Sequence, residues 1–168
     1  MTYGKDIGIS MDKFMIETYN CMLVSIFETI ANELDDQEYR KKVKNRLLMS
    51  SNKLLTTKRI VYELTRCELN NDECLVMYKY IYAYFTKANR RIKYDDIIKQ
   101  KLLMKQEYCC NICSTEINIL NSELDHIVPW SYVGDELGID NLQMLCKDCN
   151  RRKSKNSAYN LKMFLINK

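Results

Sequence analysis

The segment that decides the fold is residues 110–153, which read CNICSTEINILNSELDHIVPWSYVGDELGIDNLQMLCKDCNRRK. It begins with one Cys-x-x-Cys pair, Cys110 and Cys113, and a second pair, Cys146 and Cys149, lies near its end. Two such pairs in one short segment can supply the four thiolates that tetrahedral zinc prefers. Four sulfur ligands leave no open position for water, so we expect a structural zinc ion that stabilises this segment. The alternative is four free thiols in an ordinary fold.

The other cysteines carry less information. Cys109 could replace Cys110 as a ligand, but only Cys110 has the two-residue gap to Cys113. Three more, at positions 21, 67 and 74, lie among apolar residues at helical spacing, which is typical of small core residues.

The single histidine of the chain, His126, lies between the two cysteine pairs. Its surroundings, Glu-Leu-Asp-His-Ile-Val-Pro-Trp at 123–130, alternate in a way that predicts a short strand with Asp125 and His126 on opposite faces. A lone histidine is usually structural. This one adjoins an aspartate and is followed by Asn141 and Asn150 in a definite order. Trp130 is compatible with either a wall of a site or part of a small core.

These motifs together resemble the HNH endonuclease signature in its His-Asn-Asn form, flanked by the zinc cysteines of many family members. The resemblance covers about residues 106–155. It implies a hairpin whose first strand holds Asp125 and His126, a loop over 131–140, a second strand over 142–145 and a helix that begins near Asn150.

The resemblance also implies roles for these residues. His126 would be the general base, since imidazole, with an unperturbed pKa of about 6.5, can accept a proton at cellular pH. Asp125 and Asn150 would hold one divalent ion, Mg²⁺ or Mn²⁺. Asn141 would tie down the loop and orient the imidazole, and Lys153 would neutralise phosphate in the transition state. Other basic residues would bind neighbouring phosphates or form a solvated helix face: Arg151, Arg152 and Lys155.

Two departures from the family pattern bear on these expectations. Asn150 stands where the family often has histidine, and its carbonyl oxygen favours Mg²⁺ or Mn²⁺ over zinc at the catalytic position. Ser114 and Thr115 follow the first cysteine pair where glycine is common, which bears on the geometry of that turn.

The first hundred residues predict helices, because no glycine lies between Gly8 and Gly134 and the one proline is Pro129. Apolar periodicity and capping residues place them at about 12–34, 40–49, 53–69, 72–89 and 95–106. We therefore expect a mainly α chain: a helical region over 1–94, followed over 95–168 by a small zinc-stapled α+β module of ββα-metal type.

Composition restricts the function classes further. The net charge is +4, and basic residues gather after residue 147, as suits a phosphate backbone. No run of about 18 apolar residues and no secretion signal is present, so we expect a cytoplasmic protein without a membrane span. The predicted function is a nuclease acting on DNA more than on RNA. The alternative is a catalytically silent zinc-binding adaptor. A homodimer or a protein partner is expected to use the N-terminal helices.

Overall fold

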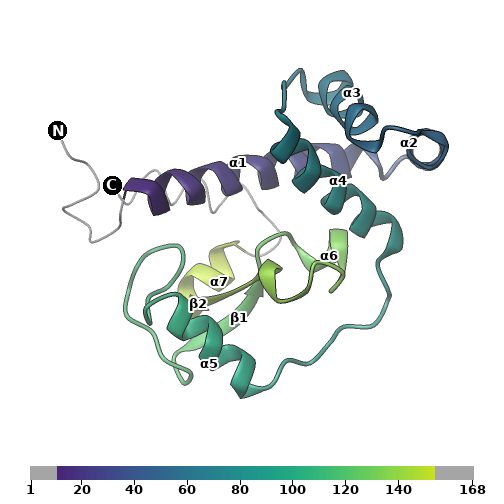
Figure 1. Cartoon of the computed structure of the whole chain (residues 1–168). Coiled ribbons are helices and arrows are strands. Elements are labelled where there is room, and N and C mark those ends of the chain that lie inside the picture. The colour runs from purple at the N-terminus through teal and green to yellow at the C-terminus, as the bar shows by residue number, and fades with distance from the viewer. Residues whose placement is uncertain (1–10, 154–168) are drawn as a thin grey trace.

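The computed structural model describes the backbone of residues 11–153 and the side chains from residue 22 to residue 153. This part of the chain is mainly helical, and it contains one two-stranded sheet (Figure 1). The expected fold class is confirmed. The helices before the sheet are α1 (Met11–Glu33), α2 (Gln37–Met49), α3 (Lys53–Thr65), α4 (Asn71–Thr86) and α5 (Asp96–Lys105).

Polar residues at the predicted positions cap these helices. The side chains of Asp36, Asn52, Asn70 and Asp95 each accept a hydrogen bond from the backbone N–H three residues later, which satisfies one of the free donors of a helix start. The prediction for α3 is wrong at its end. Arg66 adopts a left-handed conformation (φ 60°) that ends the helix at Thr65 instead of near residue 69.

A first hydrophobic core joins α1, α3 and α4, and it also contains side chains from the segment 110–153. Phe27 and Ile30 of α1 are fully buried, as the apolar stripe predicts, whereas Met22 is half exposed. Val128 and Val133, far along the chain, belong to the same core. The boundary after Tyr94 stays a prediction, and this core contains residues from both sides of it.

A second core lies under the hairpin that the motif predicts. Strand β1 (Ser122–His126) pairs antiparallel with β2 (Leu142–Cys146), with His126 opposite Leu142. Helix α5 and helix α7 (Lys147–Lys153) both contact this hairpin. The buried residues of this core are Leu102, Leu103, Cys110, Ile112, Ile117, Leu142, Met144, Leu145 and Cys149.

The connection between the strands contains two short helical turns, α6 (Trp130–Val133) and η1 (Gly138–Asn141). In Figure 1, α6 lies between α4 and the hairpin, so it joins the helical region to the module. The predicted second strand is confirmed. Helix α7 begins at Lys147 rather than near Asn150, so Cys149 and Asn150 are carried by the same helix.

No helix within residues 11–153 is long and apolar enough to cross a lipid bilayer.

Candidate active site and metal centre

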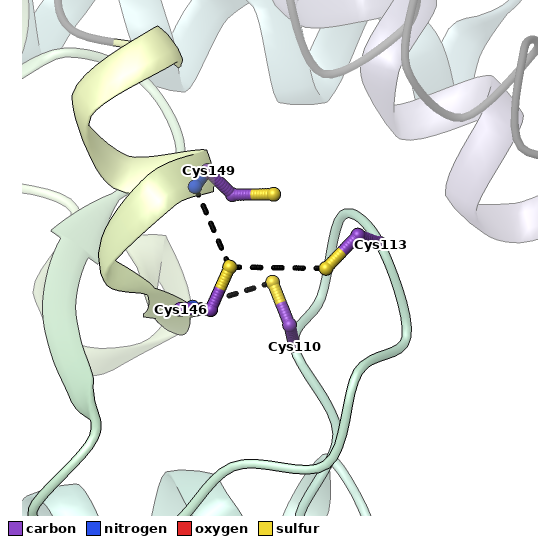
Figure 2. Close-up of side chains that lie close together, drawn as sticks. All are labelled: Cys110, Cys113, Cys146 and Cys149. Carbon is purple, nitrogen blue, oxygen red and sulfur yellow. Dashed lines mark hydrogen bonds between the residues drawn. The ribbon is translucent and has the colours of Figure 1, made fainter.

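The four cysteines of the two pairs form one cluster (Figure 2). Cys110 and Cys113 come from the turn after α5, Cys146 ends β2, and Cys149 lies on α7. All four sulfurs lie within 4.8 Å of one another, and the Sγ atoms of Cys113 and Cys146 are 3.8 Å apart. Zinc–sulfur bonds of about 2.3 Å require sulfurs separated by about 3.8 Å in a tetrahedron. The cluster can therefore hold a metal ion such as zinc.

The thiols of this cluster do not all ionise with the same ease. Burial raises the pKa of Cys110 and of Cys149. Burial also acts to raise the pKa of Cys113, but hydrogen bonds outweigh it, first those with Thr115 and then those with Cys110 and Cys149, and lower the value to about 7. Because crowded thiolates repel one another, a bound cation is what would let all four ionise together.

The turn of the first cysteine pair forms without glycine. Ser114 takes the left-handed conformation (φ 61°), and its N–H donates to the carbonyl of Cys110 at 2.9 Å. Cys109 stays outside the cluster, with its Sγ 3.5 Å from the carbonyl oxygen of Glu107. The structure therefore groups Cys110, and not Cys109, with the other three cysteines.

A cleft of about 630 Å³ lies beside the hairpin on the surface between β1, α6 and α7. Six of the residues singled out from the sequence border it, including Trp130, together with three that were not assigned a role there. The lining residues are Arg91, Asp125, His126, Pro129, Trp130, Ser131, Asn150, Arg151 and Lys153.

Asp125 is held in the cleft through one of its two carboxylate oxygens. Its Oδ2 accepts a hydrogen bond from Nε2 of Gln143 at 2.8 Å and lies 2.9 Å from the ammonium of Lys153. Gln143 is fixed in turn by Asn111, whose Nδ2 donates to Oε1 of Gln143. Both contacts fall on Oδ2, which leaves Oδ1 as the oxygen that can take a further ligand.

Lys153 lies where the spacing from Asn150 predicts, on the cleft side of α7, but it is fully buried. Its ammonium bonds Oδ2 of Asp125 and also donates to the carbonyl of His126 at 2.7 Å. We expected this side chain to reach a substrate phosphate. Its burial and these two contacts favour a different role, in which it holds the β1 residues that border the cleft.

Asn150 points its amide nitrogen at a carboxylate. Its Nδ2 donates to Oε2 of Glu123 at 2.6 Å. A carboxylate only accepts hydrogen bonds, so this contact orients the amide and turns its carbonyl oxygen away from Glu123. Asn150 borders the cleft, and its carbonyl oxygen is the atom of the amide that can act as a metal ligand.

His126 is 4% exposed, and its ring is bound by a residue from the interstrand connection. Its Nε2 lies 2.9 Å from Oδ1 of Asp135. Asp135 also accepts from the indole N–H of Trp130 (2.8 Å), the backbone N–H of Ile92 (2.9 Å) and the hydroxyl of Tyr94 (3.0 Å). Burial acts to raise the pKa of Asp135, but these hydrogen bonds outweigh it and lower the value to about 2.

Comparison with known proteins bears on this geometry. Residues 110–156 match the family model described as HNH endonuclease. This part of the chain is an HNH domain. The match contains both cysteine pairs and every site residue named from the sequence, and its last three residues lie outside the described part. The His-Asn-Asn form and the zinc ion itself stay predictions.

The CRISPR-associated endonuclease Cas9 of Actinomyces naeslundii is similar to part of this chain. The two are 38% identical over 63 residues, which is 38% of this chain and 6% of that protein. The chain therefore matches only a small fraction of that relative's length. No solved structure gives a significant match.

Not every predicted residue of the HNH domain reaches the cleft. Asn141 is buried and brackets one residue: its Oδ1 accepts from the N–H of Val128 at 2.8 Å, and its Nδ2 donates to the Val128 carbonyl at 3.0 Å. It thus fixes the chain just after β1, whereas the contact on the imidazole comes from Asp135. Arg152 is exposed and does not line the cleft, and Lys155 lies outside the described residues.

Sequence reasoning missed Asp135 and Arg91. Asp135 stands in the predicted loop 131–140, where an acidic residue has the pattern of any solvated loop residue. Arg91 comes from the stretch between α4 and α5, outside the HNH match, and lies over the ring of Trp130 at 5.9 Å. The basic run Arg90-Arg91 is a weak signal that could have drawn attention to the second of these.

Proposed function

We propose that this chain is a metal-dependent HNH endonuclease that hydrolyses phosphodiester bonds of DNA, with RNA as the less favoured substrate. The observation that carries the proposal is that Asp125, His126 and Asn150 border one cleft within the segment that matches the HNH family model. An adaptor would need the four cysteines but not these three side chains around a cleft.

His126 is the proposed general base. Its Nε2 is engaged by Asp135, so Nδ1 is the nitrogen that can take a proton from a water molecule. As the water oxygen bonds to phosphorus, the proton passes to His126 and the bond to the leaving 3′ oxygen breaks. The contact of His126 with Asp135 holds the ring in place while this happens.

Asp125 and Asn150 fit a hard divalent cation, because each offers an oxygen that its other hydrogen bonds leave available. Carboxylate and amide oxygens are the donors that Mg²⁺ and Mn²⁺ prefer, and two protein ligands are normal for Mg²⁺. When bound, such an ion stabilises the negative charge that builds on the phosphoryl and leaving oxygens. Lys153 keeps Asp125 in position for this role through its contact with Oδ2.

Two arginines on the rim of the cleft are proposed to bind phosphates. Arg151 follows Asn150 on α7, and Arg91 lines the same cleft beside Trp130. A guanidinium binds phosphate oxygens in pairs, which positions the backbone without reading its sequence. Arg152 and Lys155 are proposed to contact flanking phosphates.

A single catalytic centre cuts one strand at a time, so a break in both strands needs two copies or two visits. We propose that the helices before Tyr94 provide the contact with a second copy or another protein. On α2 the apolar side chains of Leu48 and Met49 are 64% and 87% exposed, and an interface on this helix would bury them. Light scattering at micromolar concentration tests the homodimer, and a monomeric mass would count against it.

Cleavage of supercoiled plasmid DNA and of single-stranded RNA tests the proposed activity. The protein is dialysed to remove loosely bound ions while its zinc content is monitored, and is then assayed without added metal, with Mg²⁺ and with Mn²⁺. Metal-dependent nicking of the plasmid is expected. No cleavage of either substrate with either metal, by zinc-loaded protein, would favour the adaptor alternative.

A further inference from the structure

The hydrogen bond on His126 dictates which nitrogen of the ring carries the proton. Its partner, Oδ1 of Asp135, is a carboxylate oxygen and can only accept. Asp135 remains ionised at neutral pH, because its four donors hold its pKa at about 2. The neutral imidazole must therefore carry its hydrogen on Nε2, which leaves the lone pair of Nδ1 unprotonated.

Asp135 is itself held from outside the HNH match. Two of its four donors, the N–H of Ile92 and the hydroxyl of Tyr94, belong to the stretch that joins α4 to α5. The same stretch also contacts the segment that connects β1 to β2 at a second place. There the ammonium of Lys87 donates to the carbonyl of Ser131 at 2.5 Å.

The glycine before Asp135 makes this close approach feasible. Gly134 has φ +60°, and a Cβ atom at this position would lie 3.1 Å from Cβ of Lys87. A side chain here would strain the backbone and press against the 87–94 stretch. The connection that carries Asp135 is therefore packed directly against that stretch.

We propose that Asp135 is the positioning residue for His126, and that Ile92 and Tyr94 hold Asp135 in place from outside the HNH motif. This inference rests on the proposed function for its effect on rate, whereas its effect on the imidazole can be observed without any activity. The consequence is that the HNH domain depends on the residues before it for a correctly oriented base.

Nitrogen-15 NMR of the imidazole tests the proposal directly. The chain has one histidine, so the imidazole signals can come only from His126. Spectra are recorded at about pH 8.5, where a free imidazole is neutral. The wild-type protein should show one tautomer, with hydrogen on Nε2. Asp135→Asn should show a mixture, since an amide can donate or accept. A wild-type ring with hydrogen on Nδ1, or an Asp135→Asn ring unchanged from wild type, would overturn the inference.

The rate provides the second readout. Replacing the aspartate of a His–Asp pair by asparagine can lower kcat by about 10⁴-fold, so we expect a loss of at least about 100-fold for Asp135→Asn with little change in KM. Glu136→Gln is the matched control: it neutralises the neighbouring carboxylate, which does not touch His126, and should keep the wild-type tautomer and rate. If the wild type cuts and Asp135→Asn cuts within about threefold of it, the inference is wrong.

A milder variant covers the case in which Asp135→Asn does not fold. Tyr94→Phe removes one hydrogen bond to Asp135 and keeps the ring, so kcat should fall about 2–10-fold at unchanged KM and the tautomer should be retained. An unchanged kcat would overturn the role of Tyr94. If the wild type cuts no substrate while the NMR results hold, the proposed function fails and the positioning of His126 stands.

Discussion

Oδ2 of Asp125 lies 2.9 Å from the ammonium of Lys153, and the two side chains are 13% and 1% exposed. A buried charge is costly without its partner, so each of the two depends on the other. The same ammonium donates to the carbonyl of His126, which joins Asp125 and His126 to one lysine on α7. The contact links the stability of the hairpin to the geometry of the proposed active site.

Lys153→Met should therefore destabilise the protein strongly. The substitution removes the cation paired with the Asp125 carboxylate and the donor that Lys153 provides to the His126 carbonyl. Breaking a buried pair from one side costs about 3–5 kcal/mol. Urea denaturation without added magnesium measures the free energy of unfolding. Lys147→Met, at an exposed position of the same helix, should change it by less than about 0.5 kcal/mol. Equal effects of the two substitutions would contradict the assigned contact.

Zinc content distinguishes the cysteines that ligate from the one beside them. Purified wild-type protein should carry about one zinc ion per chain, and removing it should unfold the segment around the two cysteine pairs. Cys110→Ser should lose the zinc, whereas Cys109→Ser should retain it, because only Cys110 belongs to the cluster. Metal analysis and thermal denaturation of the three proteins provide the comparison. Zinc loss in Cys109→Ser, or a wild type without zinc, would contradict the assignment.

The HNH motif could be predicted from the sequence because its signals are local. The two Cys-x-x-Cys spacings and the alternating stretch around His126 each determine a structure within a few residues. The end of α3 could not be predicted from the sequence. The helix ends because Arg66 takes a left-handed conformation, which is usually found at glycine. The contacts of Asp135 escaped prediction for another reason: Ile92 and Tyr94 reach it from more than 40 residues away, and no spacing encodes that.

The burial of Lys153 also could not be predicted from the spacing of residues in the sequence. The three-residue step from Asn150 correctly places the side chain on the cleft side of α7. Whether it faces solvent or Asp125 depends on how closely α7 packs on β1, which is a matter of tertiary structure. The spacing of two residues on a helix predicts which face of the helix a side chain is on, but it does not predict how deeply that side chain is buried.

Arg91 should contribute to DNA binding although it lies outside the HNH match. Arg91→Ala removes one cation from the cleft rim, so duplex affinity should fall about 3–10-fold, and the slope of log affinity against log salt should decrease by about 1. Arg90→Ala, an exposed neighbour that does not line the cleft, is the control and should have a smaller effect. Fluorescence anisotropy over a salt series with a short duplex gives both quantities. A larger effect for Arg90 than for Arg91 would contradict the proposed path of the phosphate backbone.

The measurement that tests the central claim most directly is the rate of plasmid nicking in Mg²⁺ by the wild type and by His126→Ala. The variant is first shown to be folded and to contain the same amount of zinc as the wild type. The account predicts that the wild type nicks the plasmid and that the variant loses at least about 100-fold in rate, because general-base catalysis contributes about 10²–10⁴-fold. Nicking by the variant at the wild-type rate would contradict the assignment of His126 as the base.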